Sequence, residues 1–140
     1  MRSRIVPLVV LALAATACGE GSMEPEEEVR EILANPSFSA DINEIIQRRD
    51  CASSGCHASD AGNMTLTADA AANYAVWVNV QADAEDFLRV EPGNPDDSYV
   101  VIKVEGRQTV GQRMPRGASP LDNIDLTNLR NWISNGAPNN

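Results

Sequence analysis

Two cysteines and the only histidine of the 140-residue chain lie within seven residues, Cys51-Ala52-Ser53-Ser54-Gly55-Cys56-His57. Two thiols followed directly by a histidine are typical of covalent haem attachment, most often with two residues between the cysteines and here with four. In that chemistry the thiols add to the two vinyl groups of haem, and the histidine is aimed at the iron from one side. The string therefore predicts one haem c attached through Cys51 and Cys56, with His57 as an iron ligand.

A disulfide between Cys51 and Cys56 is the main alternative use of the same residues. Disulfides persist in oxidising compartments, and the start of the chain predicts export. A bridge that closes so short a loop stabilises a fold only modestly, and it leaves the long loops of this chain without an organising centre. The haem interpretation is therefore favoured over the haem-free one.

Other metal and catalytic sites are poorly supported by the composition. A blue-copper site takes two histidines, and this chain has one. Structural zinc takes four nitrogen or sulfur ligands, whereas only three candidates lie close together in the sequence. No hydrolase nucleophile string is present. With haem bound in a single chain, the ligand opposite His57 is therefore a methionine, a weaker group or nothing.

Met23, Met64 and Met114 are the methionines that follow the apolar start of the chain. Met23 lies in an acidic stretch, and Met64 follows His57 by only seven residues, which is a short path to the opposite side of a haem. We predict that Met64 packs at the haem edge. Met114 lies far along the chain in a loop rich in Gly and Pro, so it can wrap to the opposite face. A gap-filling role is the alternative for Met114, but the Cys/His string favours it as the second iron ligand.

The elements that must position these residues are helices joined by long loops. Apolar spacing predicts a helix that includes Phe38, Ile42, Ile45 and Ile46, a second over residues 68–79 and a last one over residues 122–135. Residues 98–104 form a short apolar element, more helix than strand. The β-branched stretch 76–80 also allows a strand. The loop over residues 105–121 is long for a compact domain, which indicates that it serves a site.

Several segments, taken in order, make the chain resemble single-domain class I c-type cytochromes of the small bacterial, secreted kind. They are Cys51–His57, Gly62–Leu66, Arg89–Tyr99, Arg113-Met114-Pro115 and Leu121–Ala137, which ends Trp-Ile-Ser-Asn-Gly-Ala. The resemblance covers residues 38–137. It implies an all-α, cytochrome c-like fold of three or more helices and long loops wrapped around one covalently bound haem. It also implies thioethers at Cys51 and Cys56, axial His57 and Met114, and a crossing of the first and last helices near Phe38, Ile42 and Trp132.

The first 17 residues are typical of an export signal. Arg2 and Arg4 precede a 13-residue apolar run, Ile5–Ala17, which is shorter than a membrane span. Ala15-Thr16-Ala17-Cys18 resembles the lipobox of bacterial lipoproteins, in which the cysteine is lipidated; ordinary secretory cleavage is the alternative. We therefore predict a signal peptide over 1–17, an acidic tether over 18–36 that begins at a lipidated Cys18, and a cytochrome c domain over 37–138. The expected location is the periplasm, with the protein anchored to a membrane.

These features together predict periplasmic electron transfer rather than enzyme activity, because a His/Met pair fills both axial positions. Without the signal the chain keeps nine Lys and Arg against 20 Asp and Glu, a net charge of −11. This charge argues against nucleic acid and favours a redox partner with a basic docking patch. Two alternatives stay open. One is a haem-based sensor or peroxidase-like domain in which Met114 leaves the iron, and the other is a haem-free, disulfide-bonded lipoprotein that acts as a binding module.

Overall fold

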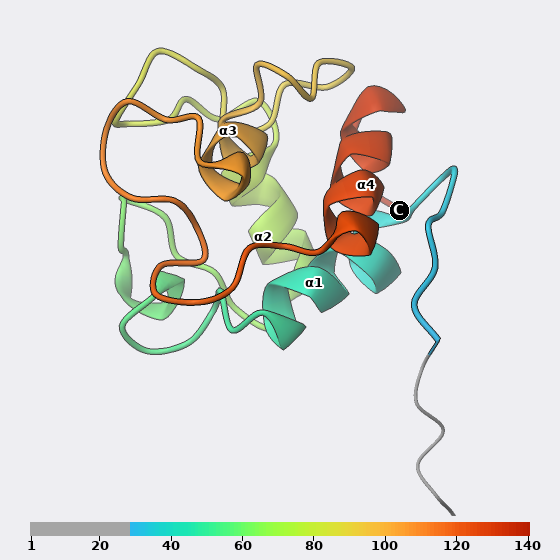
Figure 1. Ribbon diagram of the computed structural model, residues 1–140, viewed down its shortest axis with the longest axis horizontal. Coiled ribbons are helices and arrows are strands. Elements are labelled where there is room, and N and C mark those ends of the chain that lie inside the picture. Colours follow the sequence, from blue (N-terminus) through green and yellow to red (C-terminus); the bar gives the residue numbers. More distant parts are fainter. Residues whose placement is uncertain (1–28) are drawn as a thin grey trace, which may run out of the picture.

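A computed structural model describes residues 29–140 (Figure 1). The elements in chain order are a π-helical turn η1 (Phe38–Ile42), α1 (Asn43–Arg48), a short 3-10 turn η2 (His57–Ser59), α2 (Ala70–Trp77), α3 (Tyr99–Glu105) and α4 (Asn123–Ser134). Within the described residues there is no strand, and only two isolated β-bridges occur. The all-α class is therefore confirmed. The predicted signal peptide and Cys18 lie outside the described residues.

Short polar side chains cap η1, α2 and α4, whereas α1 and α3 begin without a side-chain cap. The carboxylate of Asp122 accepts hydrogen bonds from the Ile124 and Asp125 amides, both at 3.0 Å, at the start of α4. Asp69 caps α2 in the same way, so this helix begins two residues later than predicted. After Trp77 the chain extends, and the predicted strand alternative is reduced to a single bridge from Val78 to Val90.

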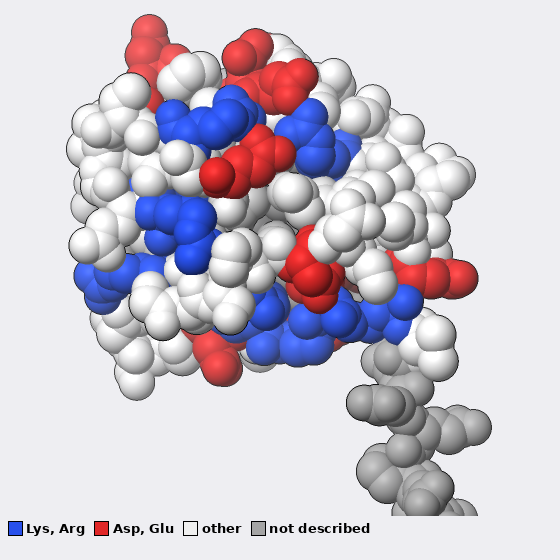
Figure 2. Space-filling view, viewed as in Figure 1, with Lys and Arg blue, Asp and Glu red and all other residues white. Residues whose placement is uncertain are grey.

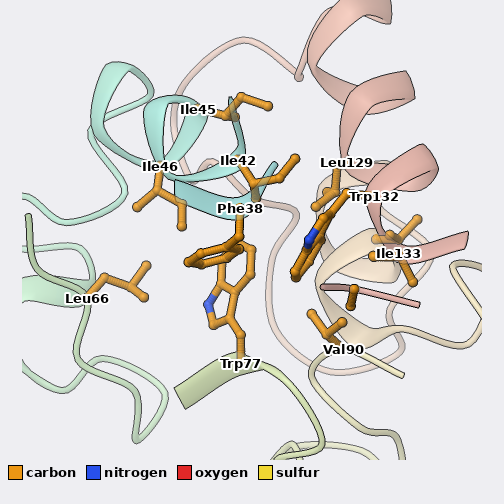
Figure 3. Close-up of a cluster of buried hydrophobic side chains, with 12 residues drawn as sticks. Phe38, Ile42, Ile45, Ile46, Leu66, Trp77, Val90, Leu129, Trp132 and Ile133 are labelled. Carbon is orange, nitrogen blue, oxygen red and sulfur yellow. The ribbon is translucent and has the colours of Figure 1, made fainter. Parts of the chain in front are cut away.

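The core forms where η1 meets α2 and α4 (Figure 3). Phe38 is fully buried, and its ring centroid lies 5.1 Å from that of Trp132 and 6.3 Å from that of Trp77. Tyr74 contacts the same phenyl ring edge-on at 5.2 Å. The expected contact between the first and last helical segments is thus present. Three aromatic side chains thus lie at the centre of a core that is otherwise aliphatic.

The segment over residues 29–36 lies along α4 without helical structure (Figure 1). Three asparagines at helical spacing bind its backbone. Asn128 accepts from the Leu33 amide at 2.8 Å, Asn131 donates to the Leu33 carbonyl at 2.7 Å, and Asn135 donates to the Ala34 carbonyl at 2.9 Å. This described part of the predicted tether is therefore bound to the domain.

A buried carboxylate joins that segment to two helices. Asp125 on α4 is 2% exposed, and its Oδ1 lies 2.9 Å from an Arg30 nitrogen and 2.6 Å from an Arg48 nitrogen. A buried charge must be paired to be tolerated, and here two guanidinium groups do so. The contacts link residues 29–36, α1 and α4 at one point.

No helix within residues 29–140 has the length and apolar character needed to cross a membrane.

Candidate functional site

A cavity of about 410 Å³ lies between the helical core and three loops. Cys51, Cys56, His57 and Met114 all line it, although Met114 comes 57 residues after His57 in the sequence. The structure thus brings the four predicted haem-binding residues together on the wall of one cavity. Most of the remaining lining is apolar, and it includes Ile42, Ile46, Leu66, Trp77, Val104 and Leu129.

The cysteine loop is closed by its own backbone. The Cys56 amide donates to the Ser53 carbonyl at 3.1 Å, and the His57 amide donates to the Cys51 carbonyl at 3.0 Å. Gly55 has φ +87°, a left-handed conformation that costs glycine little. Both thiols are partly buried and are not bonded to each other. Burial, with a smaller contribution from Cys56, raises the pKa of Cys51 to about 11.

The imidazole of His57 is held by one hydrogen bond. Its Nδ1 lies 2.7 Å from the carbonyl oxygen of Ala61. A carbonyl only accepts, so Nδ1 carries a proton, and in the neutral imidazole Nε2 then has the free lone pair. Gly62 has φ +70° beside the ring, and a Cβ there would stand 4.0 Å from the imidazole Cε1. The ring is thereby oriented with one nitrogen free to bind a metal.

Both Met64 and Met114 lie on the cavity wall. Met64 also packs against the buried core cluster. The Met114 backbone is fixed on both sides, since its amide donates to the Lys103 carbonyl at 2.9 Å and its carbonyl accepts from Arg113 at 3.2 Å. Two thioether sulfurs are therefore available in the same cavity, one seven residues after His57 and the other on the distant loop that carries Met114.

Arg89 ties together three parts of the wall, a role that sequence reasoning missed. Its guanidinium donates to the Val76 carbonyl at 3.0 Å and to the Asn63 carbonyl at 2.9 Å, and it pairs with Asp83 at 2.9 Å. The only signal in the sequence was its place at the head of the segment Arg89–Tyr99. Periodicity carries no information about such contacts, because two of the three partners are backbone carbonyls.

The loop over residues 113–120 is held by arginines from inside and outside it. Arg49 donates to the carbonyls of Ser119 and Pro120 at 2.6 and 2.9 Å. Arg113 donates to the Ala118 carbonyl at 2.8 Å, and Arg116 donates to the Gly55 carbonyl at 3.3 Å. These bonds join the Met114 loop to α1 and to the cysteine loop. They fix the two sides of the cavity relative to each other.

The donor set fits a haem with two thioether links. It offers two unbonded thiols, an imidazole with a free nitrogen, a thioether sulfur and apolar walls that suit a porphyrin ring. Among residues 29–140, no three His, Cys, Asp or Glu side chains gather as a metal-binding cluster.

Comparisons of the chain with protein families, with curated proteins and with solved structures found no match, so the functional assignment rests on the residues and geometry of this cavity.

Proposed function

We propose that the cavity holds one haem c and that the protein is an electron carrier with a cytochrome c-like fold. The observation that supports the proposal is the meeting of Cys51, Cys56, His57 and Met114 on one apolar cavity. When bound, haem supplies an iron that changes between Fe(II) and Fe(III) and so carries one electron. Cys51 and Cys56 would hold the group covalently, and His57 and Met114 would bind its iron.

The residues of the chain control how the group behaves. The Ala61 carbonyl keeps the proton of His57 on Nδ1, which directs Nε2 to the iron and makes the imidazole a stronger ligand. The sulfur of Met114 favours the reduced state and raises the potential. The apolar lining keeps water away from the group. Because two side chains would bind the iron, the site would be suited to electron transfer rather than to substrate chemistry.

The direct test is expression with the cytochrome c maturation machinery, followed by denaturation, mass determination and a visible spectrum. One haem retained covalently is the expected result, and the Cys51→Ala/Cys56→Ala variant should retain none. A colourless chain that is two hydrogens lighter than its reduced form would indicate a disulfide. That outcome would overturn the proposal in favour of a haem-free binding module.

The axial ligand is tested by a matched pair of variants. Met114→Ala should keep the haem attached but lower the potential by a sizeable part of the roughly 0.8 V over which axial ligands tune haem. It should also convert the iron to a high-spin or water-ligated form. Met64→Ala should leave the spectrum unchanged. Rapid carbon monoxide binding by the unaltered ferrous protein would favour the sensor alternative, because Met114 would then leave the iron easily.

We also propose that the protein is exported and is anchored to a membrane through Cys18. The support is the sequence of residues 1–18. Cys18→Ser should release the mature protein from the membrane fraction into the soluble fraction, with haem still attached. An unaltered protein that is already soluble, or a variant that stays bound, would contradict the anchor.

A further inference from the structure

Arg113 directly precedes Met114, but its side chain is not part of the cavity wall. The residue is half-buried, and its guanidinium spans one turn of the loop, since Nη1 donates to the Met114 carbonyl at 3.2 Å and Nη2 donates to the Ala118 carbonyl at 2.8 Å. Figure 2 shows Lys and Arg side chains at the surface over the loop that joins α3 to α4. One planar group thus joins the first and the last carbonyl of the segment Met114–Ala118.

The aliphatic stem of Arg113 packs against the end of α3. A Cβ placed on Gly106, which follows the last residue of this helix, would stand 3.2 Å from the Arg113 Cδ and 3.4 Å from its Cγ. The Met114 amide donates to the Lys103 carbonyl of the same helix at 2.9 Å. Because Val101 is fully buried and fixes α3 in the core, these two contacts connect the start of the segment to a rigid element.

The segment after Met114 depends on such contacts to be ordered. Residues 116–120 are exposed, whereas residues 113–115 are half-buried. Ordering an exposed backbone costs conformational entropy, and a loop that is ordered before its side chain binds does not lose that entropy on binding. A sulfur on such a loop therefore competes better with water and small ligands for the same position.

We propose that Arg113 is a positioning residue that keeps Met114 on the iron of the proposed haem, because it holds the segment Met114–Ala118 to the end of α3. This inference rests on the proposed function. Arg113 does not line the cavity, so it acts through Met114 alone. While the segment is held, the sulfur blocks the iron and the protein transfers electrons. When the segment is released, the iron is open to small molecules, which is the behaviour of the sensor alternative.

Imidazole measures how firmly Met114 is held, because it binds ferric iron at the position that the methionine leaves. The ferric holoprotein is titrated with imidazole, and the loss of the long-wavelength absorption band of methionine-ligated haem is followed. Arg113→Gln should raise the apparent affinity for imidazole about tenfold, since the population with Met114 detached rises by that factor. An unchanged affinity would overturn the proposal.

Two further variants separate the contact with two carbonyls from the charge. Arg113→Lys keeps the charge and most of the stem, but an ammonium group cannot span both carbonyls as the planar guanidinium does, so its imidazole affinity should also rise. Arg107→Gln removes the same charge beside Gly106 and should leave the affinity unchanged, because Arg107 bonds Glu105 and the Asp96 carbonyl instead. An unaltered affinity in Arg113→Lys, or an equal rise in Arg107→Gln, would contradict the role of the two bonds.

The Met114→Ala background tests whether Arg113 acts through Met114. In that background Arg113→Gln should change the imidazole affinity less than about twofold, because no sulfur remains to be positioned. A rise as large as in the unaltered background would mean that Arg113 shapes the cavity itself, which would overturn the proposal. If Arg113→Gln took up no haem, Arg113→Lys gives the same measurement with the same expected rise. An unaltered chain without haem, or a spectrum that Met114→Ala leaves unchanged, would instead contradict the proposed function, so the two failures are distinguishable.

Discussion

The helical half of the molecule and its loop half are stabilised in different ways. In the helical half, Phe38, Trp77 and Trp132 close against one another, and the apolar surface is largely buried. In the loop half, arginine side chains bind backbone carbonyls around a cavity of about 410 Å³. Figure 1 shows the two regions side by side, with η1, α1 and α4 on one side and the long loops on the other.

The difference indicates which half can fold unaided. A closed aromatic cluster gains free energy from burial and dispersion without any ligand. A loop region whose apolar residues face a cavity forgoes those contacts until the cavity is filled. We infer that the helical half is stable by itself and that the loop half depends on the proposed haem.

The largest effect is expected from the helical half. Trp132 is fully buried, and Trp132→Ala should lower the free energy of unfolding by about 3–5 kcal/mol through lost burial and a residual cavity. Denaturant unfolding of the holoprotein measures this change. Val29→Ala is the control, since this side chain is 89% exposed and should cost less than about 0.5 kcal/mol. If both variants lowered the free energy of unfolding by similar amounts, the helical half would not be stabilised by its buried aromatic side chains.

Withholding haem should open the loop half selectively. Amide hydrogens of residues 51–66 and 107–121 should exchange about a hundredfold faster in the haem-free chain, which corresponds to about 2.8 kcal/mol. Amides of α4 should change less, because Leu129 is the one residue of this helix that lines the cavity, whereas Trp132 and Ile133 pack in the core. The measurement is hydrogen exchange by mass spectrometry on both forms. Uniform loss of protection across the chain would show that the two halves fold as one unit.

Arg89→Gln should loosen the cavity wall with haem still bound. The variant loses an ion pair and the two carbonyl contacts of the guanidinium, for a cost of about 2 kcal/mol. Thermal unfolding of the holoprotein measures it. Arg107→Gln is the control, because Arg107 is more exposed and pairs with a neighbour two residues away. An equal loss in the control would show that Arg89 acts only as a surface charge.

The smallest effect is expected when acid protonates Glu85. Hydrogen bonds from the Val110 and Thr109 amides hold the pKa of Glu85 below its ordinary value of 4.5. Because the folded pKa is lowered, the stabilising contact is complete above about pH 4.5 and is lost as the pH falls through the folded value. The NMR shift of the Val110 amide should therefore titrate at a pH below 4.5, with little change in α4. Glu85→Gln should abolish this titration, and its persistence would contradict the contact.

The sequence predicts the helical half better than the loop half. The stripe of Phe38, Ile42 and Ile46 and the apolar spacing over residues 122–135 are local patterns, and the structure confirms the helices they predict. The bonds of Arg49 and Arg89 could not be predicted, because their acceptors are carbonyls 13 to 71 residues away that any sequence supplies. Residue type and spacing identify the four candidate haem residues in the sequence. That they line one cavity follows only from the folded structure, which brings Met114 to His57 across 57 residues of chain. Haem binding itself stays a prediction.

The seating of residues 29–36 on α4 has a consequence for how far the domain can reach. A chain attached to a surface at Cys18 has 11 steps to Val29, or at most about 40 Å when fully extended. If the α4 asparagines released the segment, the free part of the tether would extend to Ser37 and measure at most about 70 Å. A shorter tether confines the domain to a thinner layer above the surface. It thereby raises the effective concentration of the domain near any partner that is held in the same layer. With the proposed anchor at Cys18, Asn128, Asn131 and Asn135 would set the distance over which the domain reaches a partner.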